Sequence, residues 1–404
     1  MGGRYLNMKK GALSGITVVD LTRVLAGPYC SMFLADMGAN VIKVEIPNKG
    51  DDTRAYVPSY SGESAYFINL NRNKRSITLN LKSEKGKNIL KEMVKKADIV
   101  LENFRPGTMD RLNLGYDVLK EINPGIIYGC ISGFGHYGPY KERPGYDIIA
   151  QAMGGMMSTT GWPDSGPTRC GTAIGDVLAG LSLAIGVLSA HINKVKTGEG
   201  QKVDVALVDS VVSSLEIINQ IYLAENRIPE RIGNRYEAVY PYDSFAAKDG
   251  EIVIGAGNDK LFSLLANLMK QPELVNDERF LSNPLRVKNH ALLKPIIEDW
   301  LSEITMEEAV EMMLNVGVPA APIYTIDKVV TDPHIADARE MFVNLEHPLA
   351  GDMKICGNQI KLSNTPVNFE RPAPLLGQHT HEILKEILNI EEDEYNTLKK
   401  EGVL

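Results

Sequence analysis

ITVVDLTRVLAGPYCSMFLADMGANVIKVE, residues 16–45, reads as a strand, a helix and a second strand. Its two apolar runs, ITVVDL (16–21) and NVIKVE (40–45), have the length and β-branched content of buried strands. The segment between them predicts a helix over 29–38. Strands joined through a helix in this way usually run parallel, with helices covering both faces of the sheet. The stretch therefore predicts an α/β fold.

The same alternation continues towards the C-terminus. Further strands are predicted at SITLNL (76–81), DIVLEN (98–103), GIIYGCISGF (125–134) and KVDVAL (202–207), with helices at 83–96, 176–196 and near 208–225. We expect residues 1–225 to form a large Rossmann-like domain with a parallel sheet and a linker helix.

The pattern changes after residue 225. Residues 225–243 are loop-like, and strands near 242–247 and 251–256 are followed by helices near 259–269, 291–303 and 306–315. We expect a smaller α+β domain over 226–325. Residues 326–404 are expected to return to the large domain and end in two helices.

Composition excludes several classes of protein. The 404 residues carry a formal charge of −8 with a pI near 5.5, which opposes nucleic-acid binding through phosphate contacts. The four scattered cysteines show no CxxC pair that would indicate a disulfide framework or a zinc site. Residues 1–13 contain no apolar segment of a signal peptide. We therefore expect a cytoplasmic protein without a nucleic-acid or membrane partner.

One carboxylate stands out, Asp176 in GTAIGDVLAGLSLAIGVLSAH (171–191), because it lies at the start of a long apolar helix. In one interpretation it is a structural N-cap. In the other, the first-turn N–H groups and the helix dipole keep it ionised, and the small neighbours Gly175, Ala179 and Gly180 leave room for a second molecule. It would then be a nucleophile.

Other motifs are weaker. Gly133, Gly135 and Gly138 match G-x-G-x-x-G, but Pro139 and Pro144 continue a loop where a dinucleotide fingerprint opens a helix. His379 and His381 lack a carboxylate cluster, so we expect no metal.

Three segments qualify as ligand contacts. Asn103-Phe104-Arg105 ends a predicted parallel strand, the edge where doubly wound sheets bind ligands, although a structural loop is an equal alternative. Tyr146-Asp147 starts a helix, where a capping Asp is the simpler interpretation. The cations of residues 71–75, with Arg105 and Arg111, would suit one compact polyanion.

In this order the motifs resemble the class III CoA-transferase family, which includes formyl-CoA:oxalate and carnitine CoA-transferases. The resemblance covers most of the chain and is densest over residues 13–205. It is carried by LSGITVVDLTRVLAGP (13–28), GANVIKVE (38–45), NRNKRSITLNLK (71–82), ADIVLENFRPG (97–107), ISGFGHYGP (131–139), YDIIAQAMGG (146–155), IGDVLAG (174–180), TGEGQKVDVAL (197–207) and PLLGQHTHEIL (374–384).

The resemblance implies a CoA-transferase with Asp176 as its catalytic residue, forming an aspartyl anhydride and then an aspartyl-CoA thioester. It implies an acyl-CoA and a small carboxylic acid as partners. It implies no tightly bound cofactor, because CoA is a co-substrate. It also implies an interlocked, ring-like homodimer. The CoA-binding residues that it implies are Val24, Leu25, Ala26, Leu79, Asn80, Leu81, Lys82, Asn103, Phe104, Arg105, Arg111, Tyr146 and Asp147.

This chain departs from the oxalate-specific members in several places. Leu25 stands where they have a Gln, Ile46 where they have an adenine-side Arg, and Pro144 where they have a Lys that neighbouring Arg143 would have to replace. The residues around 233–257 also lack the polyglycine loop of those members. These departures disfavour an oxalate-specific enzyme.

Two alternatives remain open. An α-methylacyl-CoA racemase of the same fold needs a His where this chain has Tyr146, and tyrosine is a poor base at neutral pH. A non-catalytic CoA-binding protein would usually have lost the carboxylate at residue 176.

Overall fold

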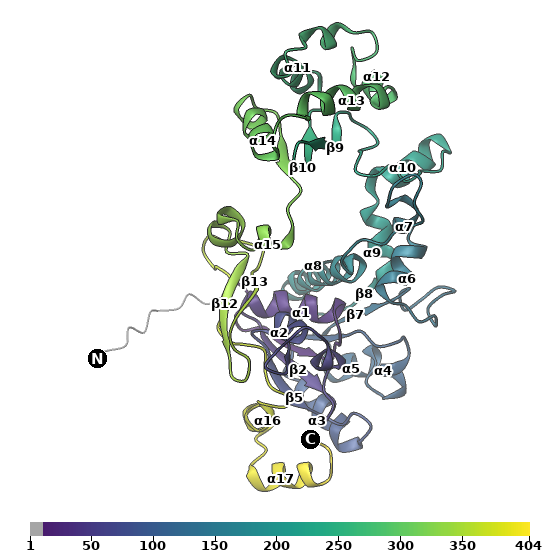
Figure 1. Cartoon of the computed structure of the whole chain (residues 1–404). Coiled ribbons are helices and arrows are strands. Elements are labelled where there is room, and N and C mark those ends of the chain that lie inside the picture. Colours follow the sequence, from purple (N-terminus) through teal and green to yellow (C-terminus); the bar gives the residue numbers. More distant parts are fainter. Residues whose placement is uncertain (1–10) are drawn as a thin grey trace, which may run out of the picture. The chain divides into compact units, whose positions relative to one another are not determined.

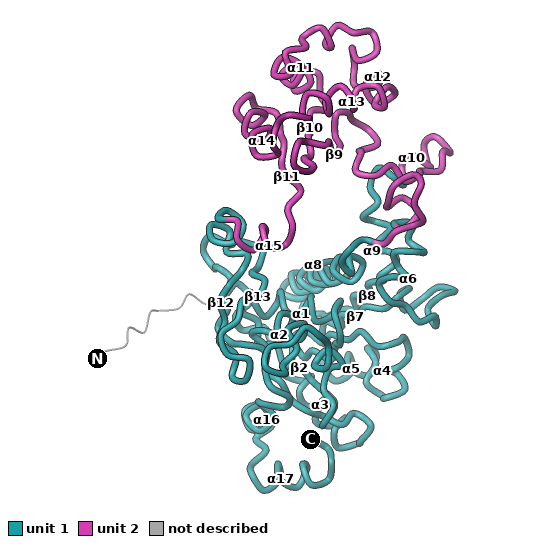
Figure 2. Tube along the Cα trace, viewed as in Figure 1, with its two compact units in different colours: residues 1–156, 170–219, 333–404 teal, residues 157–169, 220–332 magenta. Residues whose placement is uncertain are grey.

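The computed structural model describes residues 11–404, and they divide into two compact units (Figure 2). The first comprises the residues up to 156 together with 170–219 and 333–404, and the second comprises 157–169 and 220–332. Residues 1–10, most of the segment in which we expect no signal peptide, lie outside the described residues.

A six-stranded parallel sheet forms the centre of the first unit (Figure 1). Its strands lie in the order β5-β2-β1-β6-β7-β8, which is the strand order of the Rossmann fold. The strands are β1 (Thr17–Asp20), β2 (Asn40–Glu45), β5 (Arg75–Thr78), β6 (Ile99–Glu102), β7 (Ile127–Ser132) and β8 (Lys202–Ala206). All six predicted strands are confirmed, and so is the predicted parallel α/β sheet.

Helices cover both faces of this sheet because its strands alternate apolar side chains between two cores. Val18 of β1 packs in the core that includes α1 (Ala26–Asp36) and α8 (Ile174–Thr197). The next residue, Val19, packs in the core that includes α3 (Glu84–Val94) and α16 (Thr380–Leu388). Both faces are thus buried, as expected for a parallel sheet.

The small residues of α8 serve helix packing. A Cβ atom on Gly180 would lie 2.7 Å from the Ala26 carbonyl oxygen of α1, and one on Gly175 would lie 3.0 Å from Asp147 Oδ1. The prediction that these glycines leave space for a second molecule is therefore wrong, because protein atoms already fill that space. By length and hydropathy alone α8 would be able to cross a membrane, and one side of it packs on α1 and β7.

The predicted helix near 208–225 is interrupted at Leu215 and forms two helices, α9 (Leu207–Ser214) and α10 (Glu216–Glu225). The chain forms further short elements before residue 226 and after residue 332. With α9 and α10, they are η1 (Asp52–Ala55), β3 (Ser59–Tyr60), β4 (Glu63–Ser64), α2 (Ala65–Asn71), α4 (Thr108–Arg111), α5 (Tyr116–Ile122), α6 (Asp147–Met153), α7 (Met156–Thr159), η3 (Pro333–Ala338), β12 (Phe342–His347), β13 (Gly351–Cys356) and α17 (Glu392–Lys400).

The second unit contains a three-stranded antiparallel sheet in the order β11-β10-β9. Its core gathers apolar side chains of the sheet and of the helices around it, among them Phe245, Phe262 and Leu293. The elements are β9 (Tyr242–Ala247), β10 (Gly250–Gly255), α11 (Asp259–Leu268), η2 (Pro272–Asn276), α12 (Asn283–Lys288), α13 (His290–Leu301), α14 (Met306–Asn315), β11 (Ala320–Pro322) and α15 (Ile326–Val329).

Candidate active site

The candidate site lies at the carboxyl ends of β1 and β6, the point where the strand order reverses. Successive strands are added outwards from β1 on one side and from β6 on the other, so the loops that follow these two strands separate and leave a crevice. Hydrogen bonds between Asn103 and Arg23 join the two loops. Asn103 accepts a hydrogen bond from the Arg23 backbone N–H at 2.8 Å and donates one to the Arg23 carbonyl at 2.7 Å.

Two cavities open at this edge. The first, which we call the Asp176 cavity, has a volume of about 500 Å³ and is lined by eight of the predicted site residues: Val24, Leu25, Ala26, Asn103, Phe104, Arg105, Tyr146 and Asp176. The second, the Lys82 groove, has a volume of about 800 Å³ and is lined by Leu79, Asn80, Leu81, Lys82, Phe104 and Arg111. Because Arg23, Phe104 and Thr108 line both, the cavities adjoin.

Asp147 is the predicted site residue that lines neither cavity, and the structure places it at the start of α8. Its Oδ1 accepts the Gly175 N–H at 2.8 Å, and its Oδ2 accepts the side-chain amide of Gln151 at 2.7 Å. Gly175 is the second residue of α8, so Asp147 satisfies one of the free N–H groups of that helix end. The capping function is therefore performed by Asp147, which comes from α6.

Asp176 therefore does not cap α8. It is the third residue of α8, whose N-cap is Ala173, and its side chain makes no capping hydrogen bond. No residue among 11–404 donates a hydrogen bond to its carboxylate, which lies on the wall of the Asp176 cavity. Of the two interpretations of Asp176 from the sequence, the N-cap interpretation is wrong.

The protonation of Asp176 differs from what the sequence suggests. Burial, with a smaller contribution from the charge of Asp147, raises the pKa of Asp176 from 3.8 to about 7. The helix dipole stabilises a first-turn anion by only about 0.3–1 kcal/mol at a typical exposed site, so desolvation outweighs it. Near neutral pH both the acid and the carboxylate are populated.

Sequence reasoning missed three side chains of this site. Tyr56 lines the Asp176 cavity and packs edge-on against Tyr66, with ring centroids 5.7 Å apart. Burial and then the charge of Asp176 raise the pKa of Tyr66 to about 12, which places Tyr66 close to Asp176. Ser132 also lines the cavity, and its buried hydroxyl has no hydrogen-bond partner among the described residues. Only Ser132 carried a signal, since it ends a parallel strand.

Two cations of the Asp176 cavity have no acidic partner within the described part of the chain. Arg143 stacks over the Tyr140 ring at 3.6 Å, and neither it nor Arg105 forms an ion pair with a described acid. Arg143 adjoins Pro144, where oxalate-specific family members have a Lys. An anionic substrate group entering the cavity would find both guanidinium groups available.

One group of metal-ligating side chains lies below the loop that follows β6. Ligand atoms of Glu102, Cys130 and His136 lie within 4.8 Å of one another. Lys202 Nζ lies 3.1 Å from His136 Nδ1, so its positive charge would repel a metal cation at this position. The Glu102 oxygens already accept the Phe104 N–H at 2.8 Å and the Tyr128 hydroxyl at 3.0 Å. These contacts fit a role in ordering the Asn103–Phe104 loop better than a metal site.

The glycine motif at Gly133, Gly135 and Gly138 does not open a helix. The chain runs as a loop from the end of β7 to α6 and folds back on itself. A Cβ atom on Gly133 would lie 2.6 Å from the Cα atom of Gly145, so two glycine backbones touch at the rim of the Asp176 cavity. The interpretation of this motif as a structural loop is confirmed.

The fold is thus an α/β fold of Rossmann strand order, with two adjoining cavities at the switch point and the Asp176 carboxylate on the wall of one of them. Residues 13–380 match the model of CoA-transferase family III, and the chain belongs to that family. It is 38% identical to the succinyl-CoA:glutarate CoA-transferase of Homo sapiens, over 97% of this chain and 90% of the relative. It is 41% identical to the acetyl-CoA:oxalate CoA-transferase of Acetobacter aceti, over 93% of this chain and 96% of the relative.

The fold agrees with a solved structure. A CAIB/BAIF family protein from Brucella suis matches with a TM-score of 0.83 and 39% identity, over 94% of this chain and 100% of that one. The chain is thus a class III CoA-transferase, which moves CoA from an acyl-CoA to a free carboxylic acid. The transferase interpretation of the sequence is confirmed.

Proposed function

We propose that the Asp176 carboxylate is the covalent nucleophile of the transfer. One oxygen attacks the thioester carbon of the donor, the C–S bond breaks, and a mixed anhydride and CoA thiolate form. The thiolate then attacks the Asp176 carbonyl carbon, releasing the donor acid and leaving an aspartyl-CoA thioester. The acceptor carboxylate repeats these steps in reverse, so the energy of the thioester is kept throughout.

One observation supports this assignment above the others. Asp147 caps α8, and the Asp176 carboxylate therefore lines the cavity without a hydrogen-bond partner among residues 11–404. A carboxylate held in hydrogen bonds would be a weaker nucleophile, because its lone pairs would be occupied. The raised pKa also makes this oxygen more basic than that of an ordinary aspartate.

CoA is proposed to lie with its thioester in the Asp176 cavity and its nucleotide in the Lys82 groove. The groove carries Lys82, Arg111 and Lys49, while the chain as a whole carries a charge of −8. Phosphate groups prefer such cations, and charge-assisted hydrogen bonds are roughly twice as strong as neutral ones. Phe104 lines both cavities, so the pantetheine chain would pass beside its ring.

We further infer that this enzyme acts on short dicarboxylic acids. In the names of the two relatives the acceptor acids, glutarate and oxalate, and one of the donors, succinyl-CoA, correspond to acids with two carboxyl groups, whereas the donor acetyl-CoA corresponds to an acid with one. Arg143 or Arg105 would hold the carboxylate that does not react, and apolar Leu25 would contact the chain between the two groups. A panel of CoA thioesters and acids, read by mass spectrometry, tests this selectivity.

A homodimer is also inferred. Ile185, Ile192 and Val195 of α8 are 67%, 58% and 73% exposed, and their spacing places them on one side of the helix. Apolar side chains gathered on one exposed helix face are typical of a protein interface. This agrees with the interlocked dimer that the family resemblance implies.

The nucleophile is tested by trapping. After mixing with succinyl-CoA, treatment with hydroxylamine or borohydride should modify Asp176, as read by peptide mass spectrometry, and should inactivate the enzyme. Asp176→Asn should lose transfer, whereas Asp209→Asn, an exposed acid in the first turn of α9, should retain it. Full transfer by Asp176→Asn would disprove the assignment.

A further inference from the structure

Val24 has an unusual backbone conformation in the wall of the Asp176 cavity. Its φ is 67°, in the left-handed region that β-branched residues strongly avoid. It lies between β1 and α1, directly before Leu25 and Ala26, which line the same cavity. Strained backbone persists only where the surroundings impose it, and it is frequent at active sites.

Two contacts impose this conformation, one from the loop after each of the two strands that flank β1. The paired hydrogen bonds of Asn103 fix the Arg23 peptide from the β6 side. From the loop after β2, the Asp51 carboxylate accepts the Val24 N–H, with both oxygens at 3.3 Å. The peptide before Val24 is thereby held on both sides.

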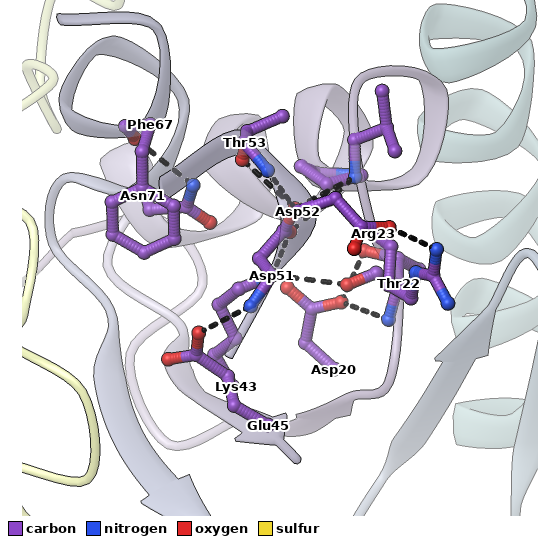
Figure 3. A network of polar contacts seen from close by, with 12 residues as sticks. Asp20, Thr22, Arg23, Lys43, Glu45, Asp51, Asp52, Thr53, Phe67 and Asn71 are labelled. Carbon is purple, nitrogen blue, oxygen red and sulfur yellow. Dashed lines mark hydrogen bonds and ion pairs between the residues drawn. The ribbon is translucent and has the colours of Figure 1, made fainter. Parts of the chain in front are cut away.

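Asp51 is itself fixed by a buried network (Figure 3). Lys43 Nζ lies 2.9 Å from Asp51 Oδ2, and both side chains are almost completely buried. Lys43 also donates to the Thr22 carbonyl at 2.9 Å, two residues before Val24. Thr53 donates to Asp51 Oδ1 through its N–H at 3.0 Å and its hydroxyl at 2.8 Å.

Both members of the Lys43–Asp51 pair stay charged near neutral pH. Burial alone would raise the pKa of Asp51, but Lys43 and the hydrogen bonds from Thr53 outweigh it and hold that pKa well below its usual value. Burial would lower the pKa of Lys43, yet Asp51 and neighbouring acids hold it above its usual value. Neither group titrates near neutral pH.

We propose that the buried Lys43–Asp51 ion pair is a positioning element of the active site, which holds Val24 in its left-handed conformation and so fixes the Val24–Ala26 wall. The proposal rests on the proposed function, in which the Asp176 cavity holds the reacting thioester. Lys43 and Asp51 do not touch the reacting atoms in this scheme. They act through the backbone of Val24.

A role in stability alone accounts for the pair less well. Buried ion pairs are often replaceable by apolar side chains without loss of stability, because desolvation offsets the attraction between the charges. This pair instead contacts two backbone groups of one short loop, Thr22 O and Val24 N. Asp51 also caps η1 through Thr53, so the pair joins that helix to the loop that forms the cavity wall.

Asp51→Asn is the first test. The Val24 N–H is shared by both oxygens of Asp51, and in this variant one of them is replaced by an NH2 group. Val24 then keeps one acceptor but also faces a donor, and either Lys43 or Thr53 loses its acceptor. Misplacing groups around the reacting atoms by about 1 Å can lower rates by about 10²-fold. We expect kcat to fall by about 10- to 100-fold. Because Asp51 also lines the Lys82 groove, the KM for succinyl-CoA does not isolate the effect on the cavity wall, and the rescue of kcat described next is the deciding measurement.

The second test is rescue. Glycine adopts the left-handed region without a steric penalty, so Val24→Gly added to Asp51→Asn should restore at least about a tenth of the lost kcat. Thr53→Val is the matched control, because it removes one hydrogen bond to Asp51 but leaves the contacts of Asp51 with Val24 and Lys43. It should lower the melting temperature without changing kcat.

Several outcomes would overturn the proposal. These are an unchanged kcat in Asp51→Asn, an equal loss of kcat in Thr53→Val, or a loss that Val24→Gly does not relieve. If Asp51→Asn does not fold, Asp51→Glu keeps the charge but displaces the carboxylate, and the same loss and rescue are expected. Failure of the nucleophile assignment is recognised separately, since it would appear as transfer activity in Asp176→Asn.

Discussion

Two carboxylates that lie close together at the start of α8 divide two tasks between them. Asp147 is hydrogen-bonded to Gly175 and Gln151 and caps the helix. Asp176 is left without such bonds, and burial and the charge of Asp147 together raise its pKa to about 7. The same pair therefore orients the helix and makes one of its members a stronger base.

The pH dependence of kcat/KM follows from this arrangement. If Asp176 is the nucleophile, as proposed, it has to be ionised, so we expect kcat/KM to fall as the pH drops below about 7, the pKa of Asp176. Asp147→Asn removes the negative charge but still accepts the Gly175 N–H, so the pKa of Asp176 should drop and the acid limb should move to lower pH. Initial rates from pH 5 to 9 measure both profiles.

Burial is the larger cause of the shift and is unchanged in Asp147→Asn, so the limb should stay above 3.8, the ordinary pKa of aspartate. Thermal unfolding at each pH controls for loss of structure. Identical acid limbs in the two proteins would show that Asp147 does not influence the nucleophile.

A second residue-scale prediction concerns the phosphates of CoA. Arg111 lines the Lys82 groove, and a hydrogen bond to a charged group contributes about 1.5–3 kcal/mol. Arg111→Ala should raise the apparent KM for succinyl-CoA about 10- to 100-fold with little change in kcat. Lys95→Ala is the control, because Lys95 is paired with Glu92 on the exposed side of α3. Equal KM values in both variants would remove Arg111 from the CoA site.

At this scale the sequence predicts Asp176 but not its partner. A helix start is visible from local spacing, so the position of Asp176 in the first turn follows from the sequence alone. The bond from Gly175 to Asp147 joins residues 28 positions apart and depends on how α6 and α8 pack. Tyr66 was missed for a similar reason, because only the packing around α2 brings it near Asp176.

At the scale of elements, the close contact of α1 with α8 sets the distance between the Val24–Ala26 wall and Asp176. A methyl group on Gly180 would meet the Ala26 carbonyl oxygen at 2.7 Å and Tyr29 Cβ at 3.1 Å. The first of these is a backbone atom of α1 and cannot move without the helix.

Gly180→Ala should therefore destabilise the protein. Alanine gains about 0.5–1 kcal/mol of helix propensity over glycine, but overpacking in a core costs about 1–3 kcal/mol, so the net effect is a loss of stability. Urea unfolding measures it, and kcat should fall as well because α1 is displaced. Ser182→Ala, an exposed position of the same helix, should leave both values nearly unchanged. A Gly180→Ala protein as stable as the wild type would mean that α1 and α8 are less tightly packed.

The elements themselves were largely predictable. Strands of this sheet are continuous apolar runs, and the helices between them repeat their apolar residues with the helical period. What the local pattern could not give was long-range pairing. Residues 320–322 form β11 by pairing with β10, although no strand is predicted there from the sequence. The break between α9 and α10 at Leu215 was also missed, since the amphipathic pattern runs through it.

At the scale of the whole molecule, sheet order decides where the site is. β1 pairs with β6 in register Val18 to Ile99, residues about eighty positions apart along the chain, and this pairing creates the switch point. The right-handed crossover rule limits the possible orders but does not select one. The family resemblance, rather than periodicity, supplied the residues proposed to bind CoA, most of which line the two cavities at this point.

Exposed apolar side chains on α8 lead to the last prediction, which concerns assembly. If two chains are interlocked, the subunits cannot separate without unfolding, so light scattering at decreasing concentration should show only dimers until the protein unfolds. Ile185→Glu combined with Ile192→Glu places charges on the proposed interface. In an ordinary dimer this change would give a folded monomer. In an interlocked dimer it should give a dimer of lower melting temperature, or no folded protein.

Leu349→Glu, at an exposed apolar residue of the β12–β13 hairpin, should leave assembly and stability nearly unchanged. A folded monomer of either the wild type or the double variant would contradict interlocking.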